Sequence, residues 1–437
     1  MSDKRPSWGS KLGVMLAAAG SAVGLGNMWR FPFSTAQNGG GSFLLIYLIC
    51  AFSIGLSLVF AEAALGMKVR SDPTDAFGWI SPKLRFIGVL CVLTSIVILP
   101  YYSVVGGWIL AYVFKVFSFA PDSDFASMFN GFAASPVEPL LYFAAYLTAT
   151  STVVYFGIQN GIEKFSKLMM PLLLVLLVVL TVRVLMLDKA WDGIVFFFRP
   201  DFSKLTGETL LNAMGQVFFS ISVGMGIYIT YGSYVKKDSV TVCQLMWPVI
   251  VLDILVSLLA GLTIFPAVFS FDVPINAGPS LIFITLPQIF VSIPFGRFFG
   301  FMFFVILLGA AATSSISLLE VAVTFMCDQL KMTRRKAVAS FAALCLAVGT
   351  LVSLSFGKLS GFKIAGKNLF DQFDFLASNI LLPTGGFLTC IAIGWVLGCD
   401  KLAVFENKFL QKCFALCIKW IAPIAIVLIL LKGLNVL

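Results

Sequence analysis

The stretch MLAAAGSAVGLGNMWRFPF at residues 15–33 is long and apolar enough to cross a bilayer, yet three glycines fall within seven residues at its centre. Gly20, Gly24 and Gly26 each weaken a helix by about 1 kcal/mol relative to alanine. Backbone groups that lose their helical partners at membrane depth cost several kcal/mol each, unless they line a cavity. A break here therefore indicates a ligand held by peptide groups near mid-membrane, as in secondary transporters.

Composition places the chain among membrane proteins with several spans. Of its 437 residues, 59% are hydrophobic and 12% are charged. The absence of histidine excludes His-dependent catalytic triads and His-ligated zinc or haem, and the nine cysteines form no metal-type pair. Because the first apolar segment carries the glycine-rich motif, we expect it to belong to the body of the protein rather than to a removable signal peptide.

Hydrophobicity predicts eleven spans joined by short polar segments. They lie near 11–36, 43–67, 86–117, 138–157, 165–187, 208–234, 242–270, 294–326, 337–356, 369–398 and 413–434. We expect one transmembrane domain over residues 1–437. Its first repeat (11–187) would hold spans 1–5, its second (208–398) spans 6–10, and span 11 would occupy 413–434.

The net charge of +9 is explained by topology. If the N-terminus is inside, inner segments hold 19 of the 30 Lys and Arg residues, and this bias predicts a cytoplasmic N-terminus and an external C-terminus. The basic charge therefore does not indicate nucleic-acid binding. The expected environment is the lipid bilayer of the inner (plasma) membrane, and no obligatory protein partner is evident.

A second interrupted span occurs at 216–234, QVFFSISVGMGIYITYGSY, where Gly224 and Gly226 follow Ser220 and Ser222. The first break lies in span 1 and the second in span 6, five spans later. Interrupted spans in corresponding positions of two halves point to a repeat with the binding site at its interface. Because five is odd, the second half begins on the opposite side of the membrane, so the repeat is inverted.

Six motifs resemble the neurotransmitter:sodium symporter family. They are SAVGLGNMWRFP at 21–32, NGGGSF at 38–43, GQVFFS at 215–220, YITYGSY at 228–234, FPAVF at 265–269 and ATSSIS at 312–317. The motifs occur in order along essentially the whole chain. The span count and short termini are similar to those of the bacterial amino-acid branch. The resemblance implies an all-α polytopic membrane protein with the LeuT fold, eleven transmembrane helices, and a 5+5 inverted repeat with spans 1 and 6 unwound at mid-membrane.

The resemblance also implies a site for a zwitterionic amino acid. The amides of Leu25 and Gly26 and the Tyr102 hydroxyl would bind its carboxylate, because half-helix N-termini carry partial positive charge. Its ammonium would be bound by the carbonyls of Ala22, Phe219 and Ser220 and by Ser222. The side-chain pocket would be lined by Ser21, Val23, Ile98, Tyr102, Phe219, Met225 and Leu318.

Two features bear on the substrate class. No aspartate occurs between Ser21 and Gly24, where monoamine-transporting relatives carry a carboxylate, so the ligand should bring its own. Met225 offers an unbranched, adaptable wall, and Ser21 is small. These residues favour large hydrophobic or aromatic L-amino acids.

Two sodium sites and no chloride are implied by the family pattern. The first sodium site would use Ala22, Asn27, Ser220, Asp253 and the substrate carboxylate. The second would use Gly20, Val23, Ala310, Thr313 and Ser314. Many relatives have asparagine in place of Asp253 and recruit chloride. Here the carboxylate would replace that anion, beside the chloride-type residues Tyr47, Gln216, Ser220 and Ser257.

Gates and structural positions complete the expected set. Arg30 and Asp374 would form an outer ion pair above an aromatic lid of Tyr102 and Phe219, and Arg5 and Asp328 an inner pair with Trp8 and Tyr234. Glu62 would hold amides of the unwound segments. Gly161 and Pro171 resemble the family feature that lets the inner end of span 5 unwind. Glu320 is a further intramembrane acid to which the sequence assigns no role.

The sequence thus predicts Na+-coupled amino-acid symport by alternating access, and not an enzyme. A sodium-independent exchanger of the same fold is one alternative, and Thr313 and Ser314 argue against it. A substrate-gated channel or receptor is a second. An intramembrane enzyme is a third, with no histidine and no apparent nucleophile–base pair to support it.

Overall fold

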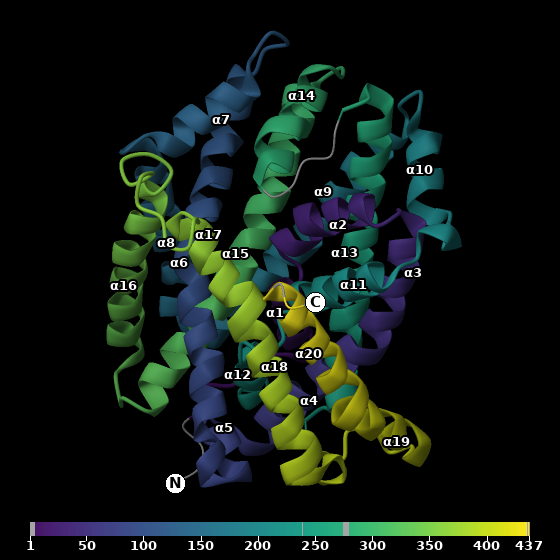
Figure 1. The fold of residues 1–437 in the computed structure, drawn as a ribbon. Coiled ribbons are helices and arrows are strands. Elements are labelled where there is room, and N and C mark those ends of the chain that lie inside the picture. Colours follow the sequence, from purple (N-terminus) through teal and green to yellow (C-terminus); the bar gives the residue numbers. More distant parts are fainter. Residues whose placement is uncertain (1–4, 238, 274–278, 435, 437) are drawn as a thin grey trace.

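The computed structural model describes residues 5–237, 239–273, 279–434 and 436, and these ranges are almost entirely helical (Figure 1). Within them the β-type pairing is a single isolated bridge between Ile364 and Lys367. The predicted all-α architecture is therefore confirmed.

The first half of the chain forms α1 (Lys11–Ala22), α2 (Phe31–Gln37), α3 (Gly41–Cys50), α4 (Leu56–Val69), α5 (Pro73–Ile80), α6 (Arg85–Lys115), α7 (Phe125–Ala134), α8 (Glu138–Tyr155), α9 (Lys164–Leu185) and α10 (Ala190–Phe198). The second half forms α11 (Gly207–Ser220), α12 (Ile227–Ser233), α13 (Val242–Phe271), α14 (Leu286–Val291), α15 (Gly296–Asp328), α16 (Arg334–Leu354), α17 (Leu369–Phe375), α18 (Leu382–Ile391), α19 (Lys408–Leu416) and α20 (Ala422–Gly433). Short π-helical segments join several of these, including η1 (Gly26–Arg30), η2 (Ala51–Gly55), η5 (Ile158–Glu163), η7 (Leu281–Thr285), η8 (Leu376–Leu381), η9 (Ala392–Gly398) and η11 (Cys417–Ile421). One-turn 3-10 segments are η3 (Pro82–Leu84), η4 (Val116–Ser118), η6 (Phe202–Lys204) and η10 (Cys399–Leu402).

Eight helices in the described ranges are long and apolar enough to cross a membrane, and there are up to ten spans if two bent helix pairs are each counted as one. The first pair is α1 with η1–α2, bent by 49°, and the second is α7 with α8, bent by 75°. Helices α11 and α12 are separated by a longer break and lie outside this count. The predicted count of eleven spans therefore stays a prediction.

Both predicted helix breaks are present. Helix α1 ends at Ala22 and helical structure resumes at Gly26. Between α11 and α12 the chain turns with positive φ at Ser222 (55°), Gly224 (84°) and Gly226 (74°). Glycine adopts such angles without steric cost, which explains its place at two of the three positions.

Helix α15 occupies the middle of the bundle and packs against α6, α9 and α1. In its most apolar window, 89% of residues are buried, against 33% for the span that contains α9. A helix buried on all sides is apolar all round and carries no polar face. The polar residues that α15 does contain therefore face other helices, which makes them candidates for function.

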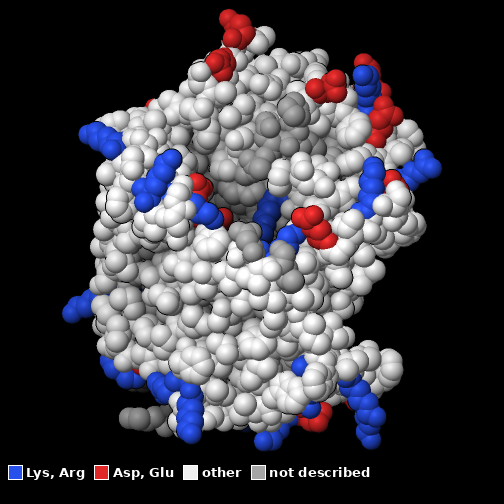
Figure 2. Space-filling view, in the orientation of Figure 1, with Lys and Arg blue, Asp and Glu red and all other residues white. Residues whose placement is uncertain are grey.

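Charged side chains gather at the two ends of the molecule and leave a largely uncharged band between them (Figure 2). The lower end, where the N-terminus lies in Figure 1, carries mostly Lys and Arg, whereas acidic side chains are prominent at the upper end. This distribution is the one expected of a chain whose basic end faces the cytoplasm.

Candidate functional site

The two helix breaks lie against each other in the middle of the bundle. The Ser222 hydroxyl donates a hydrogen bond to the Ser21 carbonyl oxygen at 3.1 Å, and Asn27 Nδ2 donates to Ser220 Oγ at 3.0 Å. The last carbonyls of a helix have no partner within that helix. The predicted ammonium-binding carbonyls of Ala22, Phe219 and Ser220 all belong to the final turns of α1 and α11.

The predicted carboxylate-binding groups also meet. The Leu25 amide donates to the Tyr102 hydroxyl oxygen at 3.4 Å. A Cβ on Gly24 would lie 3.2 Å from that oxygen and 2.8 Å from Ser314 Oγ, so this position has no room for a larger residue. The helical segment that begins at Gly26 places its first amides beside Tyr102, where they favour a negative group.

Most walls predicted for the side-chain pocket are buried around this point, whereas Tyr102 and Phe219 are partly exposed. Ile98 and Tyr102 lie one turn apart on α6, and Ser95 on the same helix donates to the Met225 carbonyl oxygen at 3.0 Å. Ser21 Oγ is 2.8 Å from Ser317 Oγ, which brings the neighbouring Leu318 to the α1 break. The structure thus collects α1, α6, α12 and α15 around the predicted substrate position, and Val23 is fully buried among them.

A polar cluster surrounds Asp253, which is fully buried on α13. Asp253 Oδ1 accepts hydrogen bonds from Asn27 Nδ2 at 2.7 Å and Ser220 Oγ at 2.8 Å, and Oδ2 accepts one from the Tyr47 hydroxyl at 3.3 Å. Ser257 Oγ accepts from Asn27 Nδ2 at 2.8 Å. Three donors around one carboxyl suit its ionised form, which only accepts hydrogen bonds.

For a sodium ion to bind among these oxygens, one side chain must change its orientation. Asn27 presents its amide nitrogen to the Asp253 cluster, while its oxygen accepts from the Gly24 amide at 2.9 Å. A cation needs oxygen ligands, so the Asn27 amide must turn over for this residue to coordinate it. The structure therefore brings three predicted members of the first sodium site together, and their role as ligands stays a prediction.

The predicted second sodium site lies between α1 and α15. A Cβ on Gly20 would lie 3.0 Å from Thr313 Cβ, so the two helices touch at this level. Ser314 Oγ donates to the Ser21 carbonyl oxygen at 3.3 Å. Thr313 Oγ1 bonds back to the Ala310 carbonyl oxygen at 3.0 Å. The predicted ligands at this point are neutral oxygens, which is the kind of ligand a sodium ion accepts.

The residues predicted for the inner gate lie together. Arg5 Nη1 lies 2.6 Å from Asp328 Oδ2, and the Arg5 guanidinium also lies 5.1 Å from the centre of the Tyr234 ring. Trp8 is 4% exposed, donates from Nε1 to the Tyr231 carbonyl oxygen at 3.0 Å, and packs edge-on against both tyrosine rings. The four residues predicted for this gate are thus in contact.

A buried loop residue before α5 contacts this predicted gate. The Asp72 amide donates to Asp328 Oδ2 at 3.1 Å, and the Asp72 carboxylate accepts from Gln329 Nε2 at 2.7 Å and from the Thr74 amide at 2.9 Å. Burial raises the pKa of Asp72, although these hydrogen bonds oppose the shift. The loop before α5 is therefore joined to the end of α15 where the gate lies.

The outer gate differs from the expectation. Arg30 and Asp374 are both described, and no ion pair within 4.0 Å joins them; the Arg30 guanidinium lies 4.3 Å from the centre of the Phe219 ring instead. Asp374 Oδ1 accepts from the Tyr101 hydroxyl at 3.3 Å, a contact that sequence reasoning missed. Phe219 and Tyr102 remain partly exposed, and Figure 2 shows the molecule hollowed above its middle. In this structure Arg30 therefore packs on the proposed lid residue Phe219, and Asp374 bonds to Tyr101, so the expected pair is not formed.

Comparison with known proteins agrees with this geometry. The model of the sodium:neurotransmitter symporter family matches residues 5–131 and 135–437. The chain belongs to this family. It is therefore a sodium-dependent secondary symporter of the membrane and not an enzyme, as predicted.

Individual relatives match this symporter over nearly its whole length. It is 36% identical to the uncharacterized sodium-dependent transporter YhdH of Bacillus subtilis, with 100% of both chains covered, and 32% identical to an uncharacterized sodium-dependent transporter of Haemophilus influenzae, with 99% and 98% covered. The crystal structure of MhsT in complex with L-phenylalanine is similar, with a TM-score of 0.89 and 40% identity over 98% of this chain and 100% of that one. The predicted LeuT-type fold is confirmed.

Glu320 of this symporter has a set of partners that its sequence position did not reveal. The side chain is fully buried, and Arg334 contacts both its carboxylate oxygens, with Nη1 2.9 Å from Oε1. The hydroxyl of Tyr234, an inner-gate residue, donates to Oε1 at 2.7 Å. Arg334 Nε also donates to the Val154 carbonyl oxygen at 2.9 Å. The signal available in the sequence was an unexplained intramembrane acid, which usually marks function.

Glu163 is a second residue that sequence reasoning missed. Its carboxylate is 4% exposed and accepts from the Gly9 amide at 2.7 Å, from Ser10 Oγ at 2.8 Å and from Lys167 Nζ at 2.7 Å. A Cβ on Gly13 would lie 2.3 Å from Glu163 Cδ. The start of α1 is therefore bound directly to the inner end of the span that contains α9.

The structural positions that were predicted are in place. Glu62 Oε1 accepts from the Gly224 amide at 2.8 Å, which satisfies a donor of the second break. Gly161 lies in η5, where a Cβ would lie 1.9 Å from the Val153 carbonyl oxygen, and Pro171 lies inside α9. The inner end of this span is helical here, so its predicted unwinding stays a prediction.

Proposed function

We propose that this symporter couples Na+ entry to the uptake of L-amino acids with large hydrophobic or aromatic side chains. The observation that carries the proposal is the meeting of the two helix breaks, which collects amide donors, carbonyl acceptors and the buried Met225 wall at one point. The similar structure of MhsT holds L-phenylalanine, which supports the same substrate class.

Alternating access would follow from which parts of the protein each bound ligand holds together. Sodium at the second site would hold Gly20 and Val23 of span 1 against Thr313 and Ser314 of α15, and so keep the inner gate closed. A substrate that spans both breaks would draw Phe219 over itself and release Arg30 toward Asp374. Loss of the second sodium would then let the N-terminal segment that precedes α1 leave Glu163 and Asp328. A ligand shifts such an equilibrium only through its different affinity for the two states.

Two sodium ions would be transported with the amino acid, and chloride would not take part. The first ion would lie between Asn27, Ser220, Asp253 and the Ala22 carbonyl, and would also touch the substrate carboxylate, which couples the two binding events. The ionised Asp253 would supply the negative charge that chloride provides in relatives. An anion 4 Å from it would be repelled by about 4 kcal/mol at an effective dielectric constant of about 20.

The proposed orientation in the plasma membrane places the N-terminus in the cytoplasm and the C-terminus outside. The N-terminal residues Arg5 and Trp8 contact Asp328 and Tyr234 of the proposed inner gate. At the other end of the chain, Lys432 of α20 lies 3.2 Å from Glu208 at the start of α11, whose far end reaches the central break. The two termini thus lie at different levels of the bundle.

The test is uptake by purified protein in proteoliposomes. Aromatic and large aliphatic L-amino acids should accumulate under an inward Na+ gradient and fail to accumulate when choline replaces Na+. A thermal-shift screen of the twenty amino acids should show stabilisation by this class, and larger shifts with Na+ present. Equal uptake in choline would indicate an exchanger and refute the coupling.

A further inference from the structure

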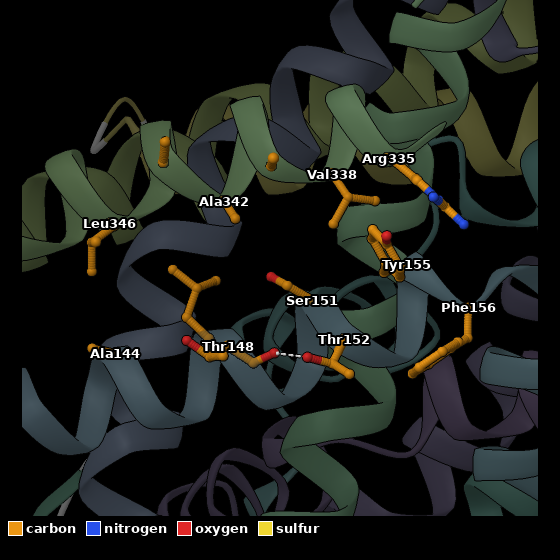
Figure 3. A pocket seen from close by; sticks show the side chains of 13 residues that line it. Ala144, Thr148, Ser151, Thr152, Tyr155, Phe156, Arg335, Val338, Ala342 and Leu346 are labelled. Carbon is orange, nitrogen blue, oxygen red and sulfur yellow. Dashed lines mark hydrogen bonds between the residues drawn. The ribbon is translucent and has the colours of Figure 1, made fainter. Parts of the chain in front are cut away.

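A groove of about 490 Å³ runs along the outer face of the bundle between α8 and α16. Small side chains form much of its wall, among them Ala144 and Thr148 on α8 and Ala339, Ala342 and Ala343 on α16. Figure 3 shows Val338 and Ala342 facing the space between the helices, with Arg335 and Tyr155 at one end and Leu346 at the other. Its volume is within the range of small-molecule sites.

The floor of the groove contains a buried hydroxyl without a partner. Ser151 on α8 is 8% exposed, and its Oγ makes no hydrogen bond, although Thr152 next to it donates to the Thr148 carbonyl oxygen at 2.8 Å. Figure 3 shows the Ser151 hydroxyl directed into the space between the two helices. A buried hydroxyl without a partner destabilises the protein, so an acceptor that reaches this point would form a favourable hydrogen bond.

One end of the groove carries a cation with no counter-ion. Arg335 is exposed, and the described residues offer it no carboxylate within 4.0 Å; its guanidinium lies 5.3 Å from the centre of the Tyr155 ring. The neighbouring Arg334 is different, because it is paired with Glu320 at the inner gate. Arg335 is thus free to bind an anion from outside the protein.

The dimensions of the groove match one leaflet of a bilayer. Eleven residues separate Arg335 from Leu346 on α16, which is about 16 Å at 1.5 Å per residue. Half of the roughly 30 Å hydrocarbon core is about 15 Å. Ser151 lies four residues, or about 6 Å, from Tyr155, and therefore one turn deeper than the charged end.

We propose that this groove binds an anionic phospholipid of the cytoplasmic leaflet. The phosphate would bind Arg335, an ester carbonyl one turn deeper would accept from Ser151, and one acyl chain would lie along the alanines. The leaflet follows from the proposed orientation, because Arg335 lies at the same end as the Arg5–Asp328 gate. A second copy of this chain is a poorer occupant, since it would bury the Arg335 charge without a carboxylate to pair with it.

The experiment measures binding of phosphatidylglycerol and phosphatidylcholine to the purified full-length chain by native mass spectrometry. Arg335→Gln should weaken phosphatidylglycerol binding about fivefold, which corresponds to about 1 kcal/mol for one basic residue at a membrane surface. Lys336→Gln is the matched control, because Lys336 is equally exposed and does not line the groove, and it should leave the affinity unchanged.

Three further variants distinguish binding in the groove from attraction to surface charge. Ala342→Phe should fill the groove and reduce bound phosphatidylglycerol, with Ala339→Leu as a second filling variant if the first elutes as aggregate. Ser151→Ala should reduce the thermal stabilisation by phosphatidylglycerol without lowering the unfolding temperature of the lipid-free protein. Equal loss in Arg335→Gln and Lys336→Gln would overturn the proposal. So would a doubled mass that Ala342→Phe abolishes, because a second copy would then be the occupant.

Discussion

At the residue scale, Asp253 is expected to determine which ions uptake requires. It accepts three hydrogen bonds and lies beside Tyr47 and Ser257, two of the residues that would otherwise surround chloride. We expect wild-type uptake to be equal in chloride and gluconate. Asp253→Asn should weaken sodium binding or make uptake respond to chloride, whereas Asp272→Asn at the end of the same helix should do neither. A strict chloride requirement in the wild type would show that the carboxylate does not replace the anion.

Thr313 and Ser314 test the second sodium site. Their joint replacement by alanine removes two of five proposed oxygens, and a hydrogen bond or contact to a charged group contributes about 1.5–3 kcal/mol. We expect the sodium concentration for half-maximal uptake to rise at least tenfold. Ser315→Ala is the control, since Ser315 is buried on the same turn but contacts Tyr146 instead. Unchanged sodium dependence in the double variant would remove these residues from the site.

Met225 tests the substrate class. Its carbonyl is held by Ser95 and its side chain is 5% exposed, so a larger residue would intrude on the proposed pocket. Met225→Phe should shift preference toward smaller amino acids by about tenfold or more, because a methylene in a pocket is worth about 1–3 kcal/mol. Met225→Leu should keep the wild-type order. Competition assays that rank amino acids identically in all three proteins would contradict the assignment.

At the scale of elements, Glu320 joins three helices at the inner gate: α15, α16 through Arg334, and the end of α12 through Tyr234. Arg334→Gln would leave a buried carboxylate without its cation, which costs about 3–5 kcal/mol. We expect a clear fall in unfolding temperature in detergent. Adding Glu320→Gln should restore part of it, because no charge then remains unpaired. Additive losses in the double variant would show that the two side chains do not interact.

At the scale of the whole molecule, the contacts among Arg5, Trp8, Tyr234 and Asp328 would hold the proposed inner gate shut in one state of the proposed transport cycle. The Trp8 amide donates to the Tyr234 carbonyl oxygen at 3.2 Å and the Gly9 amide to Glu163, so hydrogen exchange can report on this gate. Amides of residues 8–14 should exchange more slowly in Na+ than in K+, while α19 should be indifferent. Equal hydrogen exchange of residues 8–14 in both salts would show that sodium does not stabilise the closed gate.

The two breaks, the all-helical fold and the family could be predicted from the sequence because each depends on local chemistry. Glycines destabilise a helix that crosses the lipid, so a cluster of them predicts a break. Gly224 and Gly226 adopt positive φ, which glycine does without steric cost. Glu62 was expected to hold amides of the unwound segments, and it accepts a hydrogen bond from the Gly224 amide.

Other contacts were decided only by the tertiary structure. Glu320 lies on α15 and Arg334 on α16, after the connection between the two helices. Glu163 is more than 150 residues from Ser10 in the sequence. No spacing within one helix could therefore predict either pair. Arg30 rests on Phe219 rather than Asp374 because the conformation sets their separation. The groove at Ser151 is lined by side chains of α8 and α16 together, so neither helix alone predicts it. Periodicity determines which face of a helix is buried, but which helices meet there, and in which state, depends on the packing of all of them together.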